Sequence, residues 1–311
     1  MKKLAFLFPG QGSQMVGMGK DFFDVFSKAS LRYEEAEDIL GYSLKKYSFE
    51  GPDDELKQTY ITQPALFVHS VIISELLDNR GIKPAVTAGH SLGEYSALYS
   101  AGAGGFAEIL EVVKIRGELM QKAGTISPGT MAAIIGADED SVTKLCEEAS
   151  SAGIVKPANY NAPGQIVISG SVEGVRKAIE IAKGFGAKRA IELNVSGAFH
   201  SPLMEFACEG LNKQIDDTNW NKIPIPVYAN ATADPAYEPE DISRNLKDQL
   251  LKPVLWKDSI ENIIKNSGID VFIEVGSGKV LQGLTKRING EYNCYTVGAI
   301  EELEKIEELV S

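Results

Sequence analysis

The pentapeptide GHSLG at residues 89–93 is the stretch whose residue types and spacing point most directly to chemistry. It matches the G-x-S-x-G pattern, in which a serine on a sharp strand-to-helix turn exposes its hydroxyl. An apolar run, AVTAGH, leads into the serine, and a helical run, LGEYSALYSAG, follows. The sequence therefore predicts Ser91 as a nucleophile; the alternative is a small residue in a tight turn.

A serine nucleophile needs a base, and histidine suits that task near neutral pH. The chain has three histidines. His69 falls within a predicted helix over residues 63–79, where we expect a packing role. His90 precedes Ser91 on the strand, where the pleat turns neighbouring side chains to opposite sides. His200 lies in the loop VSGAFHSP, and such loops often carry chemistry. We expect His200 to be the base, with a structural loop histidine as the alternative.

Arg116 is a third candidate, in the helical run EILEVVKIRGELMQ. Most arginines on helices are solvated surface charges, which is the alternative here. Its neighbours are apolar, however, and include Val112, Val113, Ile115 and Leu119. A buried guanidinium requires an anion, and its planar fork fits a carboxylate bidentately. The pattern therefore indicates a carboxylate-binding role.

The glycine-rich loop FPGQGSQ at residues 8–14 raises the question of a phosphate site, because such loops often follow a strand in nucleotide-binding proteins. The dinucleotide pattern G-x-G-x-x-G would need a third glycine where Met15 stands. No acidic residue follows convincingly about 20 residues later at a strand end. A nicotinamide oxidoreductase is therefore a weak alternative.

Short apolar runs alternate with helical stretches along the chain, as expected for the buried strands of a parallel sheet. Helical spacing over residues 63–79 predicts a helix packed on that sheet. The fold class predicted is therefore α/β. The strand-like runs cover residues 3–8, 85–90, 225–230, 271–276 and 294–299.

Residues 125–196 show a different pattern, in which MAAIIGA, VKPANYN, QIVISGS and KRAIELNVS read as strands and two helical runs separate them. The order βαββαβ is typical of a ferredoxin-like subdomain. We therefore predict a catalytic domain formed by residues 1–124 and 197–311, with residues 125–196 inserted as a small subdomain.

Composition narrows the classes of partner. Hydrophobic residues make up 44% of the 311-residue chain and charged residues 24%, as in an ordinary globular protein. The net charge of −12 disfavours non-specific nucleic-acid binding. The first apolar run, residues 4–8, is shorter than a signal peptide requires, and no run approaches the about 18 residues of a membrane span.

The cysteines are Cys146, Cys208 and Cys294, three in number and far apart. This spacing fits neither a metal site nor a disulfide framework. Reduced thiols in a cytoplasmic protein are expected. We therefore predict no metal centre, no membrane segment and a cytoplasmic location.

Over almost its whole length the sequence resembles malonyl-CoA:acyl-carrier-protein transacylases and the related acyltransferase domains of polyketide synthases. GHSxG alone occurs in unrelated hydrolases, whereas the ordered set of motifs is specific to this family. The resemblance implies an α/β-hydrolase-like core with a ferredoxin-like insert, in agreement with the pattern above. The motifs are FPGQGSQ, TQPALF, GHSLGEYSAL, VKIRGELMQ, MAAIIG, ANYNAPGQIVISG, VSGAFHSPLM, PVYANATA, QLLKPVLW and EVGSGKVLQGLTKRI.

The resemblance also implies roles for single residues. Ser91 matches the acyl-accepting nucleophile and His200 its general base. Gln11 and Leu92 match the positions whose backbone N–H groups form the oxyanion hole. Arg116 matches the arginine that binds the malonyl carboxylate.

Two further positions match with supporting roles. Gln249 in QLLKPV matches a residue that holds the histidine, largely through its backbone carbonyl. Phe199 lies in GAFH, which resembles the HAFH pattern of malonyl-selecting polyketide acyltransferases, and would fill the space that a methylmalonyl branch needs. The family implies malonyl-CoA as substrate, an acyl carrier protein as partner and no permanently bound cofactor.

Two other function classes stay open at this point. A serine hydrolase would keep Ser91 and His200 but has no need for Arg116. A non-catalytic carrier-binding protein would be expected to have lost one of these residues. An acidic carrier protein would need a basic patch on this acidic chain; the candidates are Lys183, Lys188, Arg189, Lys279, Lys286 and Arg287.

Overall fold

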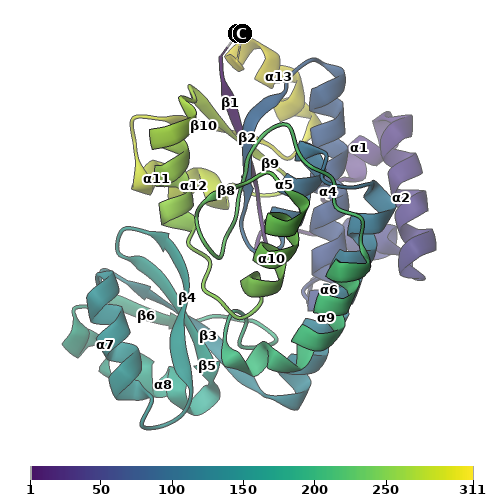
Figure 1. The fold of residues 1–311 in the computed structure, drawn as a ribbon. Coiled ribbons are helices and arrows are strands. Elements are labelled where there is room, and N and C mark those ends of the chain that lie inside the picture. The colour runs from purple at the N-terminus through teal and green to yellow at the C-terminus, as the bar shows by residue number, and fades with distance from the viewer. Residues whose placement is uncertain (1, 311) are drawn as a thin grey trace.

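The computed structural model describes residues 2–310, which form a larger part around one sheet and a smaller part around another (Figure 1). The larger sheet has six strands in the order β10-β9-β1-β2-β7-β8, all paired in parallel except β7 with β8. Each of the five predicted apolar runs overlaps one of its strands. These strands are β1 (Leu4–Phe8), β2 (Pro84–Gly89), β7 (Val227–Tyr228), β8 (Pro235–Ala236), β9 (Val271–Val275) and β10 (Asn293–Val297).

The strand β1 runs through the middle of this sheet and is buried on both faces. Phe6 and Phe8 belong to the core cluster on the side of α4 (Thr59–Asn79). Leu7 belongs to a second cluster with Trp256 on the other side. Helices therefore cover both faces, as a parallel sheet requires.

The helices of the larger part lie on either side of this sheet (Figure 1). The helices α4, α5 and α6 cover one face, and α11 and α12 cover the other. Their bounds are α1 Lys20–Val25, α2 Ser27–Leu40, α3 Asp53–Leu56, α5 Gly93–Ala101, α6 Phe106–Ile126, α9 Glu205–Asp217, α10 Pro239–Gln249, α11 Trp256–Ser267, α12 Val280–Ile288 and α13 Ile300–Val310.

Two predicted elements differ in extent from the structure. The run at residues 225–230 forms only the two-residue strand β7, because Pro226 lacks the N–H that a strand donates. The helix α4 begins at Thr59 rather than at residue 63 and continues through Pro64. The proline cannot donate to the carbonyl of Tyr60, which instead accepts the hydroxyl of Tyr42 at 3.0 Å.

The helix α4 is also the central core helix. It is long and apolar enough to cross a membrane by length and composition, but 89% of its most apolar window is buried inside the protein. Its apolar surface is therefore already covered by the fold.

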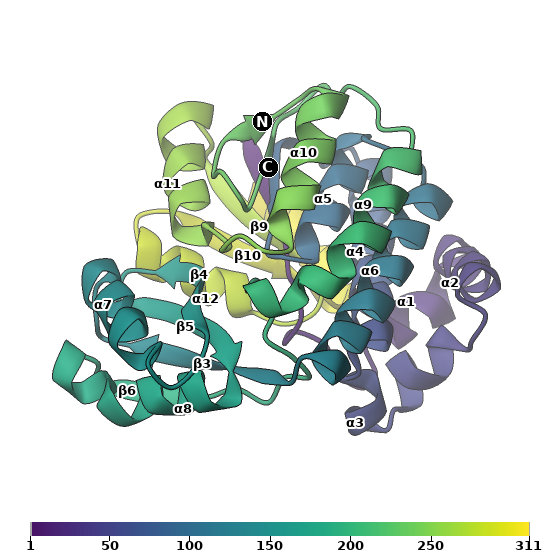
Figure 2. The ribbon, with the colours of Figure 1, turned by 60° about the horizontal axis from the view of Figure 1, so that its bottom comes forward.

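The smaller part contains a four-stranded antiparallel sheet in the order β4-β5-β3-β6 with its own hydrophobic core (Figure 2). Its elements follow one another as β, α, β, β, α and β, the order that the sequence pattern predicts. They are β3 (Gly129–Ile135), α7 (Glu139–Ala149), β4 (Val155–Ala162), β5 (Gln165–Ser171), α8 (Val172–Ile181) and β6 (Arg189–Glu192).

One backbone connection joins the two parts beside the site described below. The N–H of Tyr160 in β4 donates to the carbonyl of Val254 at 2.9 Å, and the N–H of Val254 donates to Ala158 at 2.8 Å. The carboxyl ends of β1, β2 and β7 meet at one edge of the larger sheet. The loops that leave this edge therefore lie close together and face the smaller part.

Candidate active site

Ser91 stands on a strained turn between β2 and α5. Its φ of 52° lies in the left-handed region, which non-glycine residues seldom adopt. Glycines make the turn possible: a Cβ at Gly89 would lie 1.9 Å from the backbone of Gly93, and one at Gly93 would lie 2.0 Å from the carbonyl oxygen of Phe8. The G-x-S-x-G spacing is thus explained by close backbone packing on both sides of the serine.

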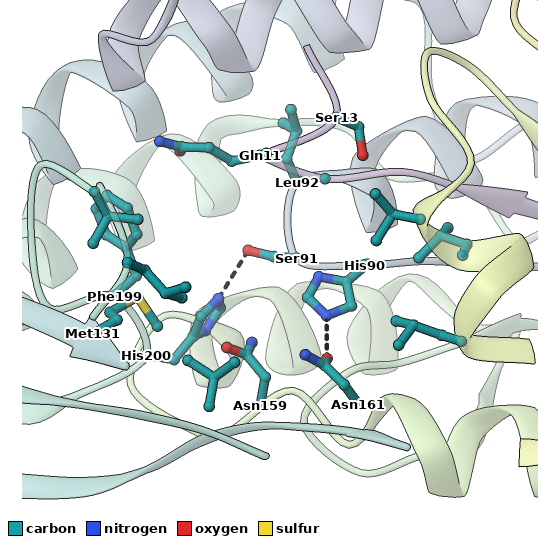
Figure 3. Close-up of a pocket in the computed structure, with 18 of the residues that line it drawn as sticks. Gln11, Ser13, His90, Ser91, Leu92, Met131, Asn159, Asn161, Phe199 and His200 are labelled. Carbon is teal, nitrogen blue, oxygen red and sulfur yellow. Dashed lines mark hydrogen bonds between the residues drawn. The ribbon is translucent and has the colours of Figure 1, made fainter. Parts of the chain in front are cut away.

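The loop FPGQGSQ lies directly against this turn. A Cβ at Gly10 would lie 2.2 Å from the carbonyl oxygen of His90, so the close approach requires glycine. The next residue, Gln11, lies near Ser91 and Leu92 at one side of the pocket (Figure 3). The backbone N–H groups of Gln11 and Leu92 donate to no acceptor within residues 2–310.

His200 and Ser91 are brought together although 109 residues separate them. His200 Nε2 lies 2.8 Å from Ser91 Oγ (Figure 3). His200 Nδ1 donates to the backbone carbonyl of Gln249 at 2.8 Å. Because the carbonyl only accepts, the proton sits on Nδ1, and Nε2 is free to accept from the serine. Burial and the charge of Arg116 lower the pKa of His200 to about 3, so the imidazole is neutral.

Arg116 lies on α6 and is 1% exposed. Its Nη1 donates to Gln63 Oε1 at 2.6 Å, and its Nη2 donates to Gln249 Oε1 and to Ser91 Oγ, both at 3.0 Å. All of these acceptors are neutral, and its Nε has no hydrogen-bond partner within residues 2–310. The ring of Tyr95 lies under the guanidinium, 5.4 Å from centroid to Cζ. A buried cation therefore faces Ser91 without a directly bonded carboxylate.

These groups line a pocket of about 210 Å³ between the two parts of the molecule. The larger part contributes Ser91, His200 and Arg116, and the smaller part contributes Met131, Asn159, Asn161 and Val167. Phe199, 6% exposed, forms part of the wall next to His200 (Figure 3). Apolar and polar side chains both line the pocket, as expected for a small polar substrate.

The other two histidines differ in their surroundings. His69 is buried against Phe22, with ring centroids 5.7 Å apart, and burial lowers its pKa to about 4, which fits the packing role expected from sequence. His90 lines the same pocket as Ser91, so strand alternation does not turn it out of the site. Its Nε2 is hydrogen-bonded to Asn161 Oδ1 at 2.8 Å rather than to the serine.

Sequence reasoning missed two polar residues near Ser91, Asn230 and Glu94. Asn230 accepts the N–H of Ser91 through Oδ1 at 2.6 Å and donates from Nδ2 to Gly89 at 2.7 Å, which holds the turn. The signal was its place at the end of the run 225–230, whose carboxyl end meets that of β2. Glu94 is a buried carboxylate in the first turn of α5, and burial raises its pKa to about 7.

The chain is similar to known proteins over almost its whole length. Residues 5–297 match the family model described as acyl transferase domain. The malonyl CoA-acyl carrier protein transacylase of Bacillus subtilis strain 168 is 45% identical over 305 residues, which cover 98% of this chain and 96% of the relative. The chain therefore belongs to the malonyl-CoA:acyl-carrier-protein transacylase family.

Solved structures extend the similarity to the fold. An acyl carrier protein S-malonyltransferase from Vibrio cholerae is 40% identical, with a TM-score of 0.93 and coverage of 98% of this chain and 99% of that chain. A malonyl-transacylase in complex with its type II PKS acyl-carrier protein is 39% identical, with a TM-score of 0.95 and 99% coverage of both chains. The mixed α/β architecture, with a largely parallel sheet and an antiparallel sheet, is therefore that of these enzymes.

Proposed function

We propose that this protein transfers a malonyl group from malonyl-CoA to the phosphopantetheine thiol of an acyl carrier protein, in fatty acid or polyketide biosynthesis. Membership of the transacylase family supports this activity. The observation that carries it is the position of Arg116, whose Nη2 lies 3.0 Å from Ser91 Oγ. A nucleophile beside a buried cation suits an acyl group that ends in a carboxylate.

The reaction proceeds in two transfers through Ser91. His200 Nε2 takes the hydroxyl proton as the serine oxygen attacks the thioester carbon; the C–S bond then breaks, and CoA leaves with that proton. In the second transfer His200 takes the proton of the carrier-protein thiol as the sulfur attacks the ester carbon; the C–O bond to Ser91 then breaks, and the serine oxygen recovers the proton from His200. The backbone N–H groups of Gln11 and Leu92 bind the oxyanion, each worth about 2.7–4 kcal/mol in comparable sites.

Arg116 selects the acyl group. A malonyl carboxylate pairs with the guanidinium, whereas an acetyl group leaves this buried cation without an anion. Phe199 is the candidate for excluding a methylmalonyl branch, since its ring narrows the pocket wall next to His200. Gln249 supports both His200 and Arg116, because its backbone carbonyl orients His200 and its side-chain amide orients Arg116.

The finer description of the architecture is part of the proposal. A parallel sheet with a nucleophile turn after β2 supports an α/β-hydrolase-like core, formed by residues 1–124 and 197–311. The element order and separate core of residues 125–196 support a ferredoxin-like subdomain. We also propose a cytoplasmic location with no bound cofactor beyond the substrate malonyl-CoA.

Docking of the carrier protein needs a basic surface near the pocket entrance. Lys188, Arg189 and Arg287 line one groove together with Gln165, which also lines the catalytic pocket. Arg287 donates to Gln165 at 2.7 Å, so the basic groove and the pocket adjoin. We propose this groove for the acidic carrier protein; Lys279 is already paired with Glu302 at 3.3 Å.

Intact-mass measurement after mixing the protein with malonyl-CoA tests the proposal. The wild type should gain the mass of one malonyl group and lose it when phosphopantetheinylated carrier protein is added, and Ser91→Ala should gain none. An unmodified wild type would contradict the proposal. Release of free malonate faster than transfer to carrier protein would support the hydrolase alternative instead.

A further inference from the structure

Glu94 is a buried carboxylate for which the two-transfer mechanism has no role. It is 2% exposed and lies in the first turn of α5, where the helix dipole favours negative charge. Its Oε2 accepts the backbone N–H of Asn230 at 3.0 Å and Gln249 Nε2 at 2.7 Å. Fully buried carboxylates are rare unless they are paired with a cation, so a cationic partner is expected.

The cation nearest in this hydrogen-bond network is the guanidinium of Arg116, which is linked to Glu94 through the side-chain amide of Gln249. Gln249 Nε2 donates both to Glu94 Oε2 and to the backbone oxygen of Ser91, at 2.7 and 3.0 Å, so both of its N–H groups are used. The amide oxygen must then face the other way, where it accepts from Arg116 Nη2 at 3.0 Å. The carboxylate of Glu94, the amide of Gln249 and the guanidinium of Arg116 thus form one chain of hydrogen bonds. This chain ends at Arg116, where the substrate carboxylate is proposed to bind.

We propose that Glu94 is the resting counter-charge of Arg116 and that, through Gln249, it competes with the substrate carboxylate for this cation. This inference rests on the proposed role of Arg116. Glu94 does not touch the acyl group and is therefore a positioning residue. When a malonyl carboxylate binds, two anions share one guanidinium, so neither is held as tightly as it would be alone. The competition keeps the malonyl-serine from becoming too stable for the second transfer.

The competition predicts a linked proton. Burial already raises the pKa of Glu94 to about 7, and a second anion at the guanidinium raises it further, so carboxylate binding takes up a proton near neutral pH. The charged or titratable groups that face this network are Arg116 from α6, Tyr95 from α5 and His200 from its loop. His90, which precedes Ser91, lines the same pocket, and burial holds its pKa below the ordinary value. The pKa of Tyr95 is raised to about 12 and that of His200 is lowered to about 3, so neither titrates between pH 6 and 8.

Calorimetric binding of monomethyl malonate, an oxygen-ester analogue of the malonyl group, tests the inference. Wild type and Glu94→Gln are compared at pH 6, 7 and 8 in two buffers that differ in ionisation enthalpy. The glutamine oxygen can still accept from Gln249, while the charge is lost. We expect Glu94→Gln to bind on the order of tenfold more tightly than wild type at pH 8, from removal of one charge at an effective dielectric of about 20.

The wild type should also bind more tightly as the pH falls from 8 to 6, with proton uptake, and the two proteins should converge at pH 6. Equal or weaker binding by folded Glu94→Gln at pH 8, or no proton uptake by the wild type, would overturn the inference. If circular dichroism shows that the variant does not fold, proton uptake by the wild type decides alone. Arg116→Ala is the control. If Arg116→Ala binds the ester as well as wild type does, or if wild type and Arg116→Ala both fail to bind it, the proposed carboxylate role of Arg116 is wrong. The inference about Glu94 is then wrong as well. Binding that requires Arg116 but ignores Glu94 refutes the inference only.

Discussion

Replacement of Arg116 by alanine should separate malonyl transfer from acetyl transfer. A guanidinium has five N–H groups, and three of those of Arg116 donate to Gln63, Gln249 and Ser91. The two that remain, on Nε and Nη1, lie on opposite edges of the guanidinium, so a carboxylate bound bidentately takes over the Nη2 N–H that donates to Ser91 Oγ, together with the N–H of Nε or of Nη1. Charge-assisted hydrogen bonds contribute about 1.5–3 kcal/mol each, and two that are not fully additive give about 3–4 kcal/mol. This corresponds to a loss of about 10²–10³ in kcat/KM for malonyl-CoA.

Acetyl transfer should survive or rise in the same variant, because the buried cation no longer has to stay unpaired beside an uncharged acyl group. The assay measures kcat/KM for malonyl-CoA and acetyl-CoA with the same carrier protein. The ratio of the two values is the diagnostic, since loss of the contact with Ser91 Oγ affects both substrates alike. Arg116→Lys, which keeps the charge without the planar fork, should recover part of the malonyl activity. An equal loss for both acyl groups would refute the carboxylate role.

Three further outcomes are expected. His200→Ala should slow formation of the malonyl-serine adduct by about 10²–10⁴, measured by rapid-quench mass spectrometry. The pKa of His200 in the wild type is lowered to about 3, and the neutral ring is the proposed base. Protonation of His200 should therefore cause no loss of the wild-type acylation rate between pH 8 and pH 5. Gly93→Ala should lower the thermal midpoint or prevent folding, since its Cβ would lie 2.0 Å from a backbone oxygen; a midpoint equal to wild type would contradict the packing argument. Arg189→Glu combined with Arg287→Glu should raise the KM for carrier protein severalfold in a salt-dependent way. The control Lys305→Glu, on the distant helix α13, should leave this KM unchanged (Figure 1). Equal effects of the double variant and the control would exclude the groove as the docking surface.

Several parts of this fold follow from local sequence alone. Apolar runs bounded by glycine and proline mark the buried strands, because a strand covered on both faces tolerates few polar residues. GHSLG marks the strand-to-helix turn that carries Ser91, because only glycine fits at positions 89 and 93. Local patterns were less accurate where proline interferes: they did not show that β7 would shrink to two residues or that α4 would continue through Pro64.

The sequence by itself therefore determined the α/β fold class, the turn at Ser91 and, through ordered motifs, the family. Only the tertiary structure decided which side chains form hydrogen bonds with one another around Ser91. Arg116 reaches Ser91 across 25 residues, and Gln249 reaches it across 158. The tertiary structure also placed His90 in the pocket with Asn161, against the expectation from strand alternation. It linked Glu94 to Arg116 through the side-chain amide of Gln249. The physical reason is that strand and turn signals are short-range, whereas a buried charge depends on whichever distant groups the fold packs around it.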